Sequence, residues 1–130
     1  MRARVLTAVL LVAMVCGCQR VPKGNWAIET GRARVVLDEQ GNRQPRISAV
    51  AWAQRDARMK LLRSIEATPA GDSNLIGDYM VQNPLIGVRV RGVILSAKQI
   101  AERYLADGTV EVDMGVNLDV VRQVIRETKP

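Results

Sequence analysis

The stretch PRISAVAWAQRDARMKLLRSIEA, from Pro45 to Ala67, carries the strongest structural signal in the chain. Small and aliphatic residues return in it at every fourth position, a spacing that places them on one face of an α-helix. Three successive alanines on that face let the helix backbone lie close against a sheet. We therefore expect a long helix packed on a β-sheet through Ala49, Ala53, Ala57, Leu61 and Ile65.

Signals along this helix support the assignment. Pro45 suits the first turn, where its missing N–H leaves no hydrogen bond unmade, and the segment TPAGD (Thr68–Asp72) ends the pattern. Asp56 and Lys60 form a favourable pair one turn apart. Three further residues flank the apolar face: Val50, Trp52 and Leu62.

The segment WAIETGRARVVL, from Trp26 to Leu37, alternates apolar and polar residues and indicates a strand. The alternation changes phase at Gly31, and glycine is a residue that bulges tolerate. We expect one strand with a bulge at Gly31, followed by a turn at DEQGN (38–42). We expect it to be an edge strand, where Arg32 and Arg34 discourage uncontrolled pairing.

A short helix is expected further along, from Pro84 to Arg91. Asn83 has the side chain of a helix cap, and Pro84 fits the first helical position. Gly92 is the expected terminator of this helix.

The segment SAKQIAERYLADGTVEVDMGVNL contains a conflict. Ser96 and Gln99 form a capping-box pattern that favours a helix over Ala97–Leu105. Ala106–Gly108, in contrast, fits a three-residue hairpin loop with glycine in the left-handed position. We choose the hairpin, because its register makes complementary cross-strand pairs: Tyr104 with Val110, Arg103 with Glu111, and Ile100 with Met114.

The segment LDVVRQVIRE indicates a short amphipathic helix at the end of the chain, with Leu118, Val121 and Ile125 on its apolar face. Together these elements predict an α/β (α+β) fold. A small antiparallel sheet carries the alanine-striped helix on one face, in a single domain over residues 26–130.

The N-terminal segment has the layout of a secretory signal. Arg2 and Arg4 precede an apolar run from Val5 to Val15, which is shorter than the about 20 residues of a membrane-spanning helix. The sequence VCGC that ends at Cys18 resembles the lipobox of bacterial lipoproteins, although Cys16 stands where alanine or serine is usual. The resemblance implies that Cys18 receives lipid. The alternatives are an ordinary cleaved signal, with Cys18 as a spare thiol, and an uncleaved membrane anchor.

These signals divide the chain into a lipoprotein signal peptide (1–17), a lipid-anchored tether (18–25) and the domain (26–130). Cleavage before Cys18 leaves 113 residues and lowers the formal charge from +6 to about +4, because Arg2 and Arg4 are removed. Gln19 is not the aspartate that favours retention in the inner membrane in many lipoproteins. The resemblance therefore implies an outer-membrane lipoprotein on the periplasmic face.

The domain also resembles the flagellar outer-membrane lipoprotein family of the FlgP type, which is related to the N-terminal domain of FlgT. The resemblance lies in AVAWAQRDARMKLLRSI (49–65), DYMVQNP (78–84), IGVRVRGVI (86–94) and RYLADGTVEVDMGVNL (103–118). It implies a structural module that takes part in flagellar or other envelope assemblies, with envelope proteins or further copies of itself as partners.

The residues themselves offer little for catalysis. The chain has no histidine, the commonest general base and metal ligand, and GVRVRG (87–92) lacks the pattern of a phosphate-binding loop. We expect no enzyme activity, no cofactor and no metal site. The scattered basic residues and scarce aromatics also argue against a nucleic-acid partner.

The isolated residues that could suggest a catalytic or binding site have simpler explanations. Ser96 with Lys98, and Ser64 with Lys60, are combinations that occur by chance in most chains. A solvated strand face accounts for Glu111 and Asp113, and we expect core or rim positions for Tyr79 and Tyr104. Trp52 is expected to serve packing. For Trp26 we expect burial in the core, the alternative being a place at a lipid interface close to the tether.

Two classes of function remain open. The first is a structural or assembly lipoprotein. The second is a small ligand-binding or hydrolytic periplasmic lipoprotein with an unrecognised site.

Overall fold

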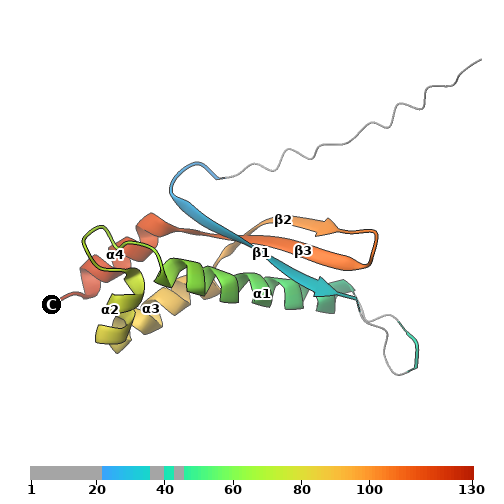
Figure 1. The fold of residues 1–130 in the computed structure, drawn as a ribbon, viewed down its shortest axis with the longest axis horizontal. Helices are drawn as coiled ribbons and strands as arrows, with labels where there is room; N and C mark the ends of the chain where they lie inside the picture. Colours follow the sequence, from blue (N-terminus) through green and yellow to red (C-terminus); the bar gives the residue numbers. More distant parts are fainter. Residues whose placement is uncertain (1–21, 36–39, 43–45) are drawn as a thin grey trace, which may run out of the picture.

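The computed structural model describes residues 22–35, 40–42 and 46–130. Figure 1 shows a sheet with helices on one side of it. This arrangement confirms the predicted α+β fold with a small antiparallel sheet. The elements in chain order are β1 (Trp26–Arg34), α1 (Arg46–Glu66), α2 (Ile76–Gln82), α3 (Pro84–Leu95), β2 (Lys98–Tyr104), β3 (Thr109–Asn117) and α4 (Leu118–Thr128).

The sheet has the strand order β1-β3-β2, so β3 is central and β1 is an edge strand as predicted. The register of β1 on β3 is unbroken, from Trp26 opposite Asn117 to Arg34 opposite Thr109. The bulge predicted at Gly31 is therefore wrong. The phase of the apolar pattern changes for another reason: the face of the strand that carries Gly31 lies against α1, and at Gly31 there is no room for a side chain.

Gly31 is the point of closest approach between β1 and α1. A Cβ atom placed on Gly31 would lie 1.8 Å from the carbonyl oxygen of Ala53 and 2.4 Å from the amide nitrogen of Ala57. The predicted alanine stripe on α1 is thus confirmed, and its members are all buried: Ala49, Ala53, Ala57, Leu61 and Ile65. Trp52 does not share in this packing, because 58% of it is exposed.

The predicted hairpin is also confirmed. The Leu105 amide donates to the Thr109 carbonyl over 2.8 Å, and Gly108 has the left-handed φ of +84° that the loop requires. Tyr104 and Arg103 lie opposite Val110 and Glu111, as expected.

The predicted pairing of Ile100 with Met114 is wrong, because an irregularity between Gln99 and Ala101 places Gln99 opposite Met114. The Ile100 side chain lies over Gly115 instead: a Cβ atom on Gly115 would meet its Cδ1 at 2.5 Å. The absence of a side chain at Gly115 makes room for Ile100 on the sheet face opposite α1.

The helices that follow α1 depart from prediction in two places. Helix α2 was not predicted, and α3 continues through Gly92 to Leu95. Gly92 has open space around it, and buried Ile94 prolongs the apolar face of α3 beyond it. The start of α3 is as predicted, since the Asn83 side chain accepts a hydrogen bond from the Leu85 amide over 3.0 Å.

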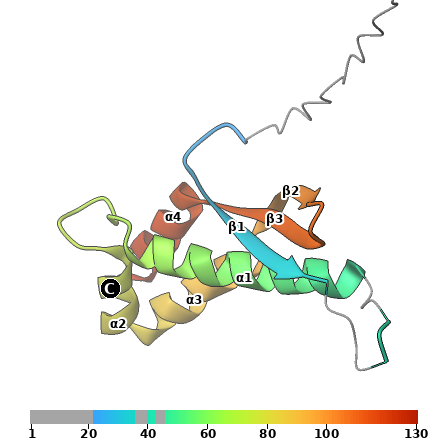
Figure 2. The same ribbon diagram turned by 45° about the vertical axis from the view of Figure 1, so that its right-hand side comes forward.

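One hydrophobic cluster holds these elements together. Its members among the described residues all lie between Ala27 and Ile125, and α4 contributes Leu118, Val121 and Ile125 as predicted. The segment from residue 22 to the C-terminus therefore contains every described member of the core. Figure 2 shows α3 on the side of α1 that is turned away from the sheet.

Candidate functional site

The predicted lipid site, Cys18, and the signal peptide lie outside the described residues. The end of the tether is described, and it is fixed to the start of α4. The Leu118 amide donates to the Asn25 carbonyl over 2.8 Å, and the Asn25 side chain contacts Asp119 at 3.5 Å. The tether therefore enters the domain where β1 begins and β3 runs into α4. In the part of the chain that the structure describes, no helix is long and apolar enough to cross a membrane.

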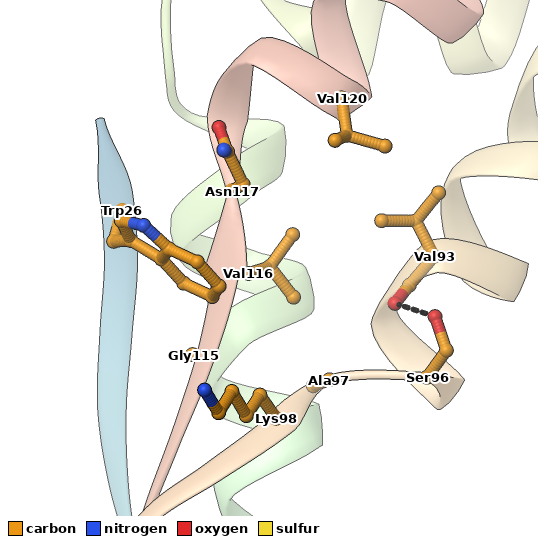
Figure 3. A pocket seen from close by; sticks show the side chains of 9 residues that line it. All are labelled: Trp26, Val93, Ser96, Ala97, Lys98, Gly115, Val116, Asn117 and Val120. Carbon is orange, nitrogen blue, oxygen red and sulfur yellow. Dashed lines mark hydrogen bonds between the residues drawn. The ribbon is translucent and has the colours of Figure 1, made fainter. Parts of the chain in front are cut away.

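A small pocket lies at this tether-proximal end. It has a volume of about 180 Å³, and Figure 3 shows Val93, Val116 and Val120 pointing into it from three different elements. The remaining lining comes from Trp26, Ser96, Ala97, Lys98, Gly115 and Asn117.

Trp26 is half-buried at this end, rather than part of the core. Its indole nitrogen donates to the Lys23 carbonyl over 3.2 Å, and its ring lies over Gly115, where a Cβ atom would be 3.2 Å from Cε3. Exposed Lys98 and Val120 lie nearby at the pocket. A tryptophan, a lysine and aliphatic groups together are a combination typical of a surface next to lipid head groups.

The open face of the sheet carries a network of ion pairs. Glu111 and Asp113 are each only 9% exposed, so the predicted solvated strand face is wrong. Arg103 contacts Asp113 with two guanidinium nitrogens, at 2.7 and 2.8 Å, and Glu111 with Nε at 3.1 Å. Arg32 contacts Glu111 at 2.8 Å, and the Thr30 hydroxyl donates to Asp113 over 2.6 Å.

This network has the chemistry of a structural cluster. The Arg103 guanidinium beside Asp113 lowers the pKa of that carboxyl, and the same contact raises the pKa of Arg103. Both carboxylates are already paired with arginine. Among the described residues there is no group of three or more side chains arranged to hold a metal ion.

The outer edge of β1 is covered by side chains of α1. The Arg32 backbone N–H donates to the Asp56 carboxylate over 3.0 Å, and Lys60 Nζ donates to the Thr30 carbonyl over 3.0 Å. Asp56 and Lys60 also form the predicted pair at 2.8 Å. Backbone groups that would template another strand are therefore occupied at this point of the edge.

The serine–lysine pairs are not brought together as catalytic groups. Lys60 points to β1 and not to Ser64, since Nζ contacts Thr30 and Asp56. The Ser96 hydroxyl donates to the Val93 carbonyl over 2.9 Å, within its own helix end. Figure 3 shows the Lys98 amine directed away from Ser96, so neither pair is arranged for proton transfer in the described structure.

The two tyrosines differ in burial. Tyr104 is half-exposed at the end of β2. Tyr79 is buried in α2, as expected, and its hydroxyl donates to Asp72. Lys129 Nζ lies 2.6 Å from the same hydroxyl. These contacts attach the C-terminus to the loop before α2.

A groove of about 520 Å³ lies between α1 and α3. The Arg55 guanidinium lies 5.6 Å from the centre of the Trp52 ring, and the Nε of Arg58 is buried without a hydrogen-bond partner among the described residues. None of the described residues that line the groove is acidic. Its lining combines four apolar side chains with three arginines: Met59, Leu62, Ile94 and Leu95, and Arg55, Arg58 and Arg91.

The sequence contains one signal for this groove, which the pattern of apolar residues does not reveal. Arg55, Arg58 and Arg91 each lack an acidic residue three or four positions away in either direction, so none can form the usual ion pair along its own helix. The structure adds that none of them forms a salt bridge with another described residue. That α1 and α3 bring them together depends on tertiary packing.

Comparison with known proteins gives no family assignment: no protein-family model, curated protein or solved structure matches the chain. The resemblance to the flagellar lipoprotein family stays a hypothesis.

Proposed function

We propose that this protein is an outer-membrane lipoprotein, held by lipid on Cys18, whose domain faces the periplasm and serves as a structural component of an envelope assembly, such as the flagellar one. The observation that carries the proposal is the short apolar N-terminal run that ends in the lipobox-like VCGC at Cys18. Acyl chains on this cysteine would hold the domain on the membrane, since each buried methylene contributes about 0.8 kcal/mol.

The tether-proximal end of the domain supports this orientation. Trp26, Lys98 and Val120 lie together there, beside the point where the tether enters. Amphipathic aromatic rings and long cationic side chains are the groups that prefer a membrane–water interface.

Lipid on Cys18 would also promote assembly. Restriction to a surface raises the effective concentration of the domain for lateral contacts. Because the middle of the β1 edge is covered by Asp56 and Lys60, the surfaces that remain for such contacts are the β2 edge and the helical side. The helical side exposes large apolar residues on α1 and α3, among them Trp52, Val88 and Leu95.

The lipid anchor is tested by expressing the full chain and a Cys18→Ser variant in a Gram-negative host fed with labelled palmitate. We expect label on the wild-type protein alone, and we expect the labelled protein in the outer-membrane fraction. Label on neither version would contradict the lipoprotein assignment. Label with the protein in the inner membrane would contradict the proposed location.

The second class of function, a ligand-binding periplasmic lipoprotein, is favoured by one specific observation. The groove between α1 and α3 has apolar walls, carries arginines that form no salt bridge with a described residue, and has the volume of a small-molecule site.

A further inference from the structure

We propose that the groove between α1 and α3 binds an anionic amphiphile, a molecule with one aliphatic chain and a carboxylate or phosphate head. This inference depends on the groove's own residues. The experiments below therefore test it independently of the proposed lipid on Cys18.

The apolar half of the groove would hold the aliphatic chain. Ile94 is buried and joins the groove to the core, while Met59 is 50% and Leu95 is 72% exposed. Large apolar side chains in water gain free energy when an aliphatic chain covers them, in proportion to the area removed from water. Met59 is also flexible enough to adapt to chains of different shape.

The three arginines would hold the head. A guanidinium group presents its N–H donors in a planar fork that matches the oxygens of carboxylate and phosphate. Arg58 Nε is buried with its donor unused in the described structure, and a buried donor without a partner is costly. An anionic oxygen in the groove would supply that partner. Because no described lining residue of the groove is acidic, an anion would not compete there with a carboxylate of the described structure.

The size of the groove favours a small ligand over a docked protein segment. Its volume of about 520 Å³ lies within the range of about 300–1,000 Å³ that is usual for small-molecule sites. Arg55 and Arg58 are neighbours on one side of α1, and Arg91 faces them from α3. Such an arrangement suits one compact anionic head better than carboxylates spread along a peptide helix.

Trp52 provides a direct readout, since Arg55 both lines the groove and lies over the Trp52 ring. The experiment uses the chain from Gln19 to Pro130, which keeps every described core residue and has no acyl chain of its own to fill the groove. A Trp26→Phe change leaves Trp52 as the single tryptophan. Brominated stearate, titrated below its micelle concentration, should quench Trp52 fluorescence and reach saturation.

Charge variants test the arginines. In the Arg58→Gln/Arg91→Gln double variant we expect the affinity for brominated stearate to fall at least about tenfold. Arg34→Gln is the control for loss of a positive charge, because Arg34 lies at the far end of β1, beside Asp107, and it should bind like the parent. Thermal unfolding of each variant confirms that the domain is intact.

Competition with ligands that carry no bromine tests the chemistry of the ligand's head group. Stearate and a lysophosphatidylglycerol should both displace the probe, and the tighter of the two identifies the natural head as carboxylate or phosphate. Stearyl alcohol, which has the same chain without charge, should bind at least about tenfold more weakly.

Three results would overturn the proposal: quenching that never saturates, equal affinity for stearate and stearyl alcohol, or unchanged affinity in the double arginine variant. Displacement of the probe by an acidic amphipathic peptide that binds more tightly than stearate would overturn it too. That last result would assign the groove to a partner protein.

Discussion

At Gly31 the distance between β1 and α1 depends on the absence of a side chain. A Cβ atom there would overlap the Ala53 carbonyl, at 1.8 Å, and that carbonyl belongs to the backbone of a helix and cannot rotate away. The alanines of α1 complete this contact from the other side. The small residues of the two elements therefore depend on one another. A larger side chain on either element would push the helix away from the sheet.

We expect Gly31→Ala to destabilise the domain by about 3 kcal/mol, the upper end of the usual cost of overpacking, as measured by chemical denaturation. Gly92→Ala is the matched control, since Gly92 lies in the interior of α3 with open space around it. It should stabilise by up to about 1 kcal/mol through helix propensity. A Gly31→Ala variant as stable as the parent would mean that helix and sheet lie farther apart than described.

The three strands are joined on their open face by the ion-pair network, in addition to the apolar contact of Ile100 and Trp26 over Gly115. Arg103 on β2 and Arg32 on β1 both reach the carboxylates of β3. Because Glu111 is 11% exposed at its side chain, reversing the charge of Arg32 would place two carboxylates together. Arg32→Glu is therefore expected to weaken the folded domain itself. Among the described residues, Arg34 forms only one ion pair, a long and exposed one with Asp107 at 3.6 Å.

The network predicts a pH dependence. The pKa of Asp113 is lowered by its hydrogen bond from Arg103, so its stabilising effect is present above the ordinary carboxyl pKa, about 3.9. It is lost as pH falls through the lower pKa of the folded state. We expect the free energy of unfolding to fall below about pH 4, and to fall less steeply in Asp113→Asn.

At neutral pH, Asp113→Asn should cost about 1–2 kcal/mol, because one partner of a half-buried pair is removed. Denaturation across a series of pH values measures both effects. An identical pH slope in the variant would show that other carboxyls, and not Asp113, cause the acid sensitivity.

At the scale of the whole molecule, the tether and the covered strand edge restrict how copies can meet. The described contacts on the β1 edge involve Asp56 and Lys60, so contacts through the β2 edge or the helical side are the ones we propose.

We expect the lipidated protein in mild detergent to form oligomers, and Arg34→Glu to leave their size unchanged, as measured by light scattering. Loss of the oligomers in this variant would show that the β1 edge is used after all. A monomeric wild-type protein would instead favour the ligand-binding function.

Local patterns were sufficient for most elements of the fold. The alanine stripe, the Asn83–Pro84 cap, the glycine of the hairpin loop and the last amphipathic helix each act over a few neighbouring residues, so their sequence spacing predicts them. Helix α2 has no such strong repeat, and the extension of α3 past Gly92 depends on the burial of Ile94. For the candidate groove, the sequence shows only that three arginines have no acidic residue one helical turn away. It does not show that these arginines lie together.

The remaining features depend on contacts between residues far apart in the chain. A glycine is needed at position 31 because the Ala53 backbone lies against it. Glu111 can be buried because Arg32 and Arg103 pair with it. The groove exists because α1 and α3 lie side by side. Spacing along one element says which side chains share a face, because helix and strand periods are local. It does not say what lies opposite that face. Burial, ion pairs and grooves form where two elements pack together, and only the tertiary structure decides which elements pack together.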